Sequence, residues 1–240
     1  MLTEHLLALD PDSYYAATQH QLLEEIGSLQ LPPKNMRAWM VQDKFYTDGY
    51  INMLSKMMGR LPEQAREIAH DSADIENEQD ITKRLYKNLS FAHENIIREA
   101  SFFDNLIKRY ESPSAPDIIK PLTNEYVEFQ QRVTEESDSH LGEAIILLWA
   151  MERVFYDAWS YASSLLKAIP TSENENEHIK TIRELIDNWT SQEFEKFVDE
   201  CAFHVNALPV TSAGQMDSYE QVFRDMLVFE QKFWDLAYEL

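Results

Sequence analysis

Residues 140–168, HLGEAIILLWAMERVFYDAWSYASSLLKA, decide the fold class of this chain. Apolar side chains recur along this stretch at spacings of three and four residues, which is the period of a helix. The stretch therefore predicts one long and very apolar helix. The same period continues on both sides of it and predicts roughly seven or eight helices in all.

Proline, glycine and polar turns separate the expected helices. No segment requires a strand, and no Gly/Ser-rich linker or internal repeat divides the chain. We therefore expect an all-α fold, a helical bundle that forms one domain over residues 1–240. Besides 140–168, the pattern predicts helices over about 13–29, 33–59, 62–75, 90–110, 123–133, 177–207 and 216–240.

The composition excludes several classes of protein. Gly 5 and Pro 9 are too few for a turn-rich β-sandwich, and a hydrophobic content of 44 % argues against intrinsic disorder. The formal net charge of −21 argues against duplex nucleic acid and anionic membranes as partners, because both would repel such a surface. Cys201 is the only cysteine, which excludes an internal disulfide and a cysteine-based zinc site.

The sequence also lacks a targeting signal of the usual kind. No stretch approaches ~18 uninterrupted apolar residues, the length of a spanning helix. The N-terminal residues, MLTEHLLALDPD, carry no basic region like that of a secretory signal. We therefore expect a soluble, cytoplasmic protein with no membrane partner.

Three acidic residues, Asp43, Glu152 and Glu230, lie on the apolar faces of predicted helices. A lone buried carboxylate is costly, so it must be hydrogen-bonded, paired or protonated. For any one of them, a structural acid bonded to a buried Tyr, Trp or Arg is the simpler interpretation. The helical neighbours of Glu230, for example, are Phe223, Met226, Leu227, Phe233, Trp234 and Ala237.

Three such acids on three helices favour a functional site. The expected site is a pocket with aromatic walls, in which carboxylates act as acceptors or proton carriers. Such walls suit a flat, nitrogen-bearing ring, because the ring can stack while the carboxylates bind its amino group and ring nitrogens. The pocket would favour an amine-rich or protonated heterocycle over an anion.

Four stretches in this order resemble the TenA/thiaminase II family. Residues 39–46, WMVQDKFY, resemble the family's W-x-x-Q-D-x-x-Y stretch, and residues 229–238, FEQKFWDLAY, are similar to its closing helix, Y-E-x-x-F-W-x-x-A-Y. Residues 149–159, WAMERVFYDAW, resemble the W-A-x-E-x-x-Y pattern of the eukaryotic-type branch, and residues 188–197 resemble the stretch that follows. The resemblance extends over about residues 30–240.

The resemblance implies a haem-oxygenase-like all-α fold without haem. It implies hydrolysis of the exocyclic C–N bond of a 4-aminopyrimidine with an aminomethyl-type substituent, which salvages the pyrimidine of degraded thiamine. It implies no metal or organic cofactor, a small-molecule aminopyrimidine substrate and a homo-oligomer.

The same resemblance assigns roles to individual residues. Asp43 matches the aspartate that holds the exocyclic amino group and a ring nitrogen, and Glu230 matches the catalytic glutamate that shuttles protons. One branch of the family has a nucleophilic cysteine where this chain has Ala150 or Met151. The eukaryotic-type branch lacks that cysteine and has a glutamate at the place of Glu152, which we interpret as a second catalytic carboxylate. The aromatic pocket positions fall near Tyr46, Tyr126, Phe155 and Trp189.

Other candidate sites are weaker. Cys201 is surrounded by apolar residues at helical spacing and is predicted to be a small core residue. Glu67 and His70 have the spacing found in di-iron helix bundles, but a Glu-x-x-His pair is common by chance. Glu136, His140 and Glu143 lie next to a polar turn.

Two alternatives to the hydrolase remain at this stage. A protein of the same fold could act on another heterocyclic amine or as a metal-dependent oxidase. A non-catalytic pyrimidine-binding or regulatory protein could have kept the pocket and lost the chemistry, which the missing cysteine favours and the three carboxylates oppose.

Overall fold

The computed structural model describes residues 1–63, 81–110, 116–137 and 141–240. Within these residues the regular secondary structure is entirely helical, which confirms the predicted all-α fold class. The helices are α1 (Leu2–Leu7), α2 (Pro11–Thr18), α3 (Gln21–Gly27), α4 (Pro33–Arg60), α6 (Ile81–Ile107), α7 (Pro121–Glu136), α8 (Gly142–Leu166), α9 (Glu177–Trp189), α10 (Gln192–Asn206), α11 (Ala213–Asp235) and the 3₁₀ helix η2 (Leu236–Tyr238).

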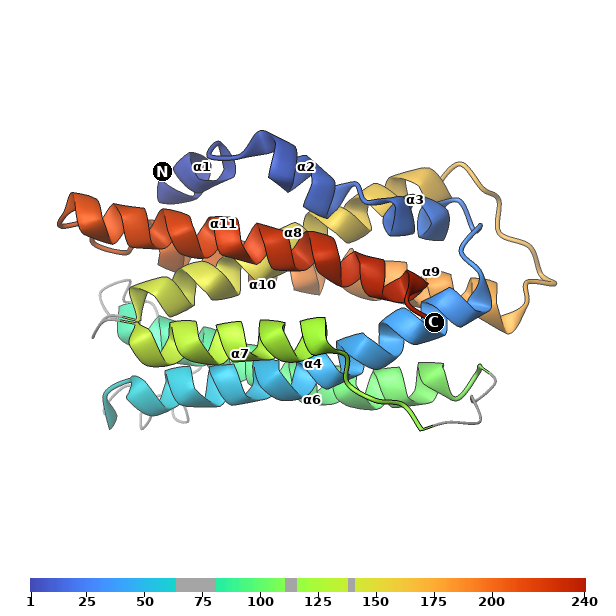
Figure 1. Cartoon of the computed structure of the whole chain (residues 1–240), viewed down its shortest axis with the longest axis horizontal. Helices are drawn as coiled ribbons and strands as arrows, with labels where there is room; N and C mark the ends of the chain where they lie inside the picture. Colours follow the sequence, from blue (N-terminus) through green and yellow to red (C-terminus); the bar gives the residue numbers. More distant parts are fainter. Residues whose placement is uncertain (64–80, 111–115, 138–140) are drawn as a thin grey trace.

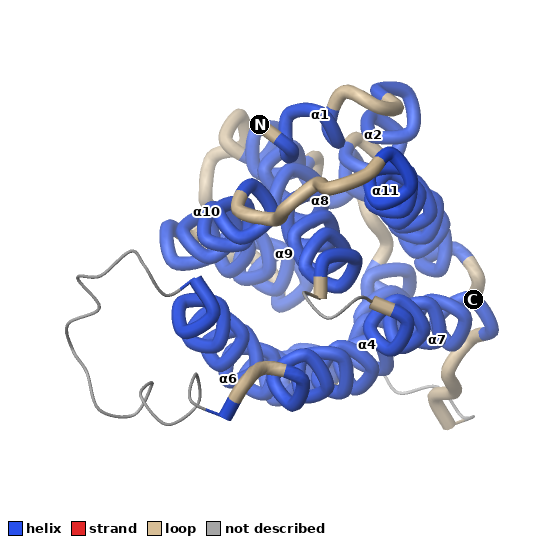
Figure 2. Tube along the Cα trace, turned by 90° about the vertical axis from the view of Figure 1, so that its left-hand side faces the viewer, coloured by secondary structure: helices blue, strands red, loops and turns tan. Residues whose placement is uncertain are grey.

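Helix α8 lies at the centre of the bundle. It contacts α2, α3, α7, α9, α10 and α11, and the end-on view in Figure 2 shows it among them. Helices α4, α6 and α7 run side by side along one flank, while α1 to α3 cover the opposite flank (Figure 1). The apolar stretch 140–168 is thus the helix around which the others pack. Within the described part of the chain, no helix combines the length and apolarity needed to cross a membrane.

Four indole rings form a closed layer inside the bundle, which we call the tryptophan layer. Trp39 of α4 stacks on Trp234 of α11 with ring centroids 5.8 Å apart. Trp159 of α8 packs on Trp189 of α9 at 4.6 Å, and Trp39 lies 5.6 Å from Trp159. All four side chains are at most 1 % exposed, so the layer ties four helices together.

The single helix predicted over 13–29 is wrong, because the chain breaks between α2 and α3. The carbonyl of Ala17 accepts a hydrogen bond from the Trp234 indole N–H at 2.8 Å. His20 then adopts an extended backbone, and its Nδ1 accepts from the Leu22 amide at 3.1 Å to cap α3. A long-range contact and a local cap therefore replace one turn of helix.

The helix predicted over 177–207 is also two helices. The hydroxyl of Ser191 accepts from the amide of Phe194 at 3.2 Å and caps α10, so that two residues separate the end of α9 from the start of α10. Helix α6 begins nine residues before the predicted start at 90, and α1 was not predicted. Most of the helix predicted over 62–75 lies outside the described residues.

Helix α4 is fixed against α7 and the segment before it. The amide of Gln42 donates to the carbonyl of Ile118 at 2.9 Å and accepts from the amide of Lys120 at 2.9 Å. At Gly49 the two helices come so close that a Cβ would lie 2.6 Å from a methyl carbon of Val127. These contacts hold the middle of α4, which faces the interior, in a fixed place.

Candidate functional site

A pocket lies between α4, α6, α7, α8, α9, α10 and α11. Its space measures about 660 Å³, a figure that includes the opening to solvent. The structure brings every site residue predicted from the sequence to the wall of this one pocket, while their roles stay predictions. These residues are Asp43, Tyr46, Tyr126, Glu152, Phe155, Trp189 and Glu230.

Four carboxylates line the pocket, each from a different helix: Asp43 from α4, Glu99 from α6, Glu152 from α8 and Glu230 from α11. None of the described residues that line the pocket is Lys, Arg or His. Like charges enclosed without a cation disfavour ionisation. The pocket is therefore built to hold protons or a cationic ligand.

Glu230 is hydrogen-bonded to a tyrosine. The hydroxyl of Tyr126 donates to Glu230 Oε1 at 2.5 Å, and both side chains are at most 5 % exposed. Burial raises the pKa of Glu230 to about 7, and the hydrogen bond opposes that rise. Glu230 therefore gains and loses its proton near neutral pH, as a proton carrier must.

Glu152 has a similar arrangement on the neighbouring helix. The hydroxyl of Tyr50 donates to Glu152 Oε1, and this hydrogen bond lowers the carboxyl pKa. Burial has the larger effect and, with the nearby charges of Glu99 and Glu230, raises the pKa of Glu152 to about 8. Glu152 and Glu230 thus form two tyrosine-bound carboxyls whose pKa values lie about one unit apart.

Asp43 differs from both, because no described residue donates a hydrogen bond to its carboxylate. The side chain is 6 % exposed. Burial, with the charges of Glu99 and Glu230, holds the pKa of Asp43 well above its usual range. The carboxylate of Asp43 therefore has lone pairs with which it can accept hydrogen bonds from a ligand in the pocket.

Aromatic rings form most of the remaining wall. The ring of Tyr46 lies 5.1 Å from that of Tyr126 and 5.6 Å from that of Phe233. Phe155 meets Trp189 edge-on at 4.9 Å. The wall thus offers both ring faces and ring edges, which suits a flat ligand.

Sequence reasoning missed Glu99 and Tyr50 as pocket residues. Glu99 accepts hydrogen bonds on Oε1 from the indole N–H of Trp189 at 3.0 Å and from the side-chain amide of Asn188 at 3.4 Å. The same signal that singles out the other acids could have found it. Five of its six helical neighbours are apolar, the sixth being Asn95: Ala92, Ile96, Phe102, Phe103 and Leu106.

Two sulfur atoms lie in or near the site, and neither is an exposed thiolate. Met151 Sδ accepts from the hydroxyl of Tyr46 at 3.1 Å and from the amide of Gln130 at 3.5 Å. Cys201 is 2 % exposed, and burial raises the pKa of its thiol well above the ordinary value. Its Sγ accepts from the amide of Asn88 at 3.3 Å, which fits the predicted core residue.

Among the described residues, no three His, Cys, Asp or Glu side chains are close enough to hold a metal ion. The four pocket carboxylates are therefore spread around the cavity and do not form one ligand set. Glu67, His70 and His140 lie outside the described residues.

The profile of the TENA/THI-4/PQQC family matches residues 11–240 of this chain. The chain is 27 % identical over 256 residues to a Fusarium pseudograminearum protein named "probable transcription factor". That match covers 92 % of this chain and 49 % of the Fusarium protein, so the chain spans about half the length of this relative.

Two solved structures are similar over nearly their whole length. A TenA homologue from Pyrococcus furiosus gives a TM-score of 0.79 at 20 % identity, over 99 % of this chain and 100 % of the homologue. A Sulfolobus solfataricus protein described as a candidate tena-like thiaminase gives 0.63 at 13 % identity, over 100 % and 97 % of the two chains. At these identities the structures establish the shared fold, which confirms the haem-oxygenase-like bundle.

Proposed function

Since this chain belongs to the TENA/THI-4/PQQC family, we propose that it hydrolyses the exocyclic C–N bond of a 4-aminopyrimidine that carries an aminomethyl-type substituent. The products are a hydroxymethylpyrimidine and ammonia or an amine. The reaction would salvage the pyrimidine of degraded thiamine in the cytoplasm. The observation that carries the proposal is one aromatic pocket with two tyrosine-bound carboxyls and a third carboxyl that lacks a protein donor.

Ring binding falls to Asp43 and the aromatic wall. The carboxylate of Asp43 accepts hydrogen bonds from the amino group of the ring, for which it has free lone pairs. The side chains of Tyr46 and Phe155 pack against the faces or edges of the substrate ring. A cationic or amine-bearing ligand also lowers the cost of ionising the carboxyls around it.

Glu152 and Glu230 divide the acid and base work. The pKa values of about 8 and about 7 both lie near neutral pH, so one member of the pair can be protonated while the other is ionised. The ionised member takes a proton from water, whose oxygen bonds to the methylene carbon as the C–N bond breaks. An amine that enters as an ammonium group leaves as ammonia, and the protonated member then gives its proton to a ring nitrogen. An amine that enters neutral takes the proton of the protonated member as it departs.

This chemistry requires no cysteine nucleophile. No cysteine lies among the described residues that line the pocket, and the thioether of Met151 has no proton to lose. The description of the Sulfolobus neighbour as a candidate thiaminase supports C–N cleavage in this fold. The name of the Fusarium relative belongs to a protein about twice as long.

The test is ammonia release from 4-amino-5-aminomethyl-2-methylpyrimidine. The wild-type chain should release ammonia and the hydroxymethylpyrimidine, whereas Glu230→Gln should lower kcat by about 10²- to 10⁴-fold, because an amide cannot carry the proton. Glu94→Gln, an exposed acid on α6, is the matched control and should keep full turnover. No ammonia from the wild type would contradict the proposal, and full turnover by Glu230→Gln would move the proton-carrying role to Glu152.

A further inference from the structure

Glu99 is a pocket carboxylate without a role in the proposed hydrolysis. Its Oε1 accepts all the hydrogen bonds that reach this side chain from the described residues: from Trp189 Nε1 at 3.0 Å, and from Asn95 and Asn188 side-chain nitrogens at 3.4 Å. No described residue donates to Oε2. One oxygen is therefore fixed by the protein, while the other is left to accept from something else.

A purely structural acid would not need this arrangement. The indole N–H of Trp189 could be satisfied by a neutral acceptor such as a glutamine carbonyl, at less cost than an enclosed carboxylate. Burial raises the pKa of Glu99 and so disfavours its ionisation, although the hydrogen bonds from Trp189, Asn188 and Asn95 oppose that rise. A cation in the cavity would reverse that effect.

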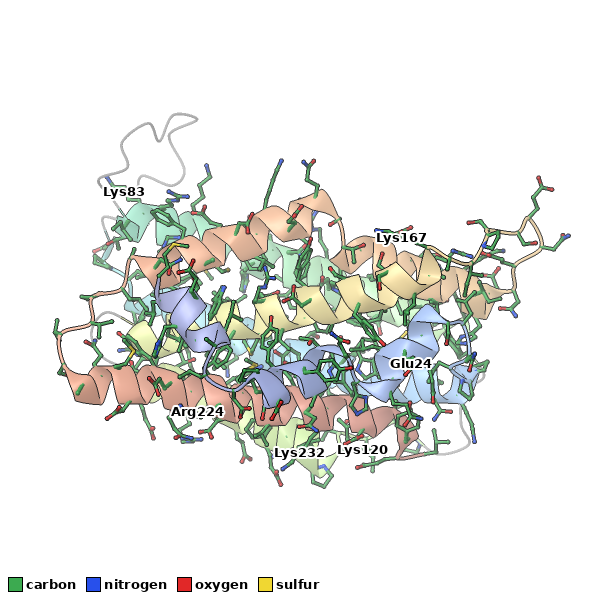
Figure 3. The ribbon with its side chains drawn as sticks, turned by 90° about the horizontal axis from the view of Figure 1, so that it is seen from above. Glu24, Lys83, Lys120, Lys167, Arg224 and Lys232 are labelled. Atoms are coloured by element: carbon green, nitrogen blue, oxygen red, sulfur yellow. The ribbon has the colours of Figure 1, made fainter. Side chains whose placement is uncertain are left out.

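The wall of the cavity supplies no such cation, because no described lining residue is basic. Arg98, the residue before Glu99, has the smallest effect among the causes that lower the pKa of Glu99, and its exposed guanidinium donates to Asn95 Oδ1. Basic side chains such as Lys167 and Lys232, labelled in Figure 3, are exposed on the outside of the bundle. The positive charge that balances the pocket has to come with the ligand.

We propose that Glu99 is a specificity-determining residue whose Oε2 accepts a hydrogen bond from a protonated amine on the substrate's substituent. The pocket then takes rings with a cationic substituent, binds those with a neutral hydroxymethyl group less tightly, and rejects phosphorylated ones by repulsion from four carboxylates. It follows that product, which has lost the ammonium group, is held less tightly than substrate. The identity of the ring rests on the proposed function, whereas the charge preference does not.

The experiment measures the ratio of two affinities by calorimetry. The first pair is 4-amino-5-aminomethyl- and 4-amino-5-hydroxymethyl-2-methylpyrimidine, titrated into Glu230→Gln to prevent turnover. The second pair is benzylamine and benzyl alcohol, which lack the pyrimidine. Each pair is measured with and without Glu99→Gln, which keeps an acceptor for Trp189, and with Glu94→Gln as the exposed control on the same helix.

The expected result is a 10- to 100-fold fall in the cation-over-neutral ratio on Glu99→Gln, as for loss of one charge-assisted hydrogen bond. The neutral ligand of each pair should change by less than about threefold, and Glu94→Gln should leave the ratio as it is. Equal weakening of both members would mean that Glu99 only supports Trp189, and would overturn the inference. An unchanged ratio would overturn it as well.

The two proposals can fail separately. If the ratio falls as expected but the wild type releases no ammonia, the charge preference stands and the hydrolase does not. If ammonia is released and Glu99→Gln leaves the cation-over-neutral affinity ratio unchanged, the hydrolase stands and the inference about Glu99 is wrong. If neither cation of the two pairs binds, both are wrong.

Discussion

Three helices, α4, α8 and α11, carry residues of both the tryptophan layer and the pocket, one turn apart, and Trp189 of α9 belongs to both. On α4, Trp39 belongs to the layer and Asp43 to the pocket, and on α11 the corresponding residues are Trp234 and Glu230. On α8, Trp159 follows Phe155 of the pocket wall by four residues. One level is thus filled by indole rings, and the next is left open and lined with acids.

The difference between the two levels teaches how a small chain holds charges in its interior. Phe155 stacks on Trp234 with centroids 5.8 Å apart and planes 13° apart, so the closed level supports the open one. The closed level has its own cost, since the indole N–H groups of Trp39 and Trp159 are buried without a partner. Packing of the tryptophan layer fixes the positions of the helices. The carboxyl groups of the pocket, in contrast, lower the stability of the fold because they are buried.

Trp234→Ala should have the largest effect on stability. The substitution leaves a cavity beside Trp39 and deprives the Ala17 carbonyl of its donor, and losses of this kind cost about 3–5 kcal/mol. Urea unfolding should show that loss, while Lys232→Ala, exposed on the same helix, should stay within about 0.5 kcal/mol of wild type. A loss below ~1 kcal/mol for Trp234→Ala would mean that the layer does not hold the helices together.

The acids should make stability fall as pH rises. Glu152 and Glu230 hold their protons more tightly in the folded chain than at the ordinary value of 4.5, so the folded state loses stability from about pH 4.5 until their pKa values of about 8 and about 7 are passed. Between pH 5 and pH 8 the wild type should lose on the order of 3 kcal/mol more than Glu152→Gln, which has no such proton. Urea midpoints at both pH values measure the difference, and parallel losses in the two proteins would place Glu152 outside the titrating group.

Asp43→Asn should weaken binding and spare the fold. The amide places a donor where the ligand's amino group also donates, at a cost of about 1–3 kcal/mol, so KM for the aminopyrimidine should rise at least as much as kcat falls. Stability at pH 7 should be unchanged or higher, because an uncharged side chain is easier to bury. Asp48→Asn, exposed one turn along α4, is the control and should change neither parameter. A fall in kcat alone would give Asp43 a chemical role in place of an anchoring one.

Met151→Leu should have the smallest effect. The volume is nearly kept, and the change removes a weak acceptor from the Tyr46 hydroxyl, so the free energy of unfolding should fall by less than about 1.5 kcal/mol. Turnover should stay within a few-fold of wild type, measured by ammonia release. A large loss of activity would show that the thioether orients Tyr46 in the pocket.

Local patterns in the sequence predict a large part of this structure. The long helix 140–168 agrees with α8 to within two residues at each end, because apolar spacing is a property of one segment. Asp43, Glu152 and Glu230 lie on apolar helix faces, which have to be buried, and this pattern predicted that they share one pocket. The break before α10 was readable too, since Ser191 is a standard capping residue.

What could not be predicted depends on contacts between distant segments. The end of α2 is stabilised by an indole 217 residues away, and the oxygen of Glu99 is held by an indole 90 residues away. No spacing rule indicates that α6 brings its acid to the pocket of the other three. The pairing of Tyr50 with Glu152 likewise joins residues 102 apart.

The origin of the four acids on four helices, from residue 43 to residue 230, also couples ligand binding to the whole fold. No fragment of the chain that lacks one of these helices holds the complete pocket, so a ligand that fills it binds the folded chain and not the unfolded one. At a hundred times its dissociation constant, such a ligand adds about 2.7 kcal/mol to the free energy of unfolding. A rise in melting temperature with ligand concentration is therefore a means of screening candidate substrates without knowing the reaction.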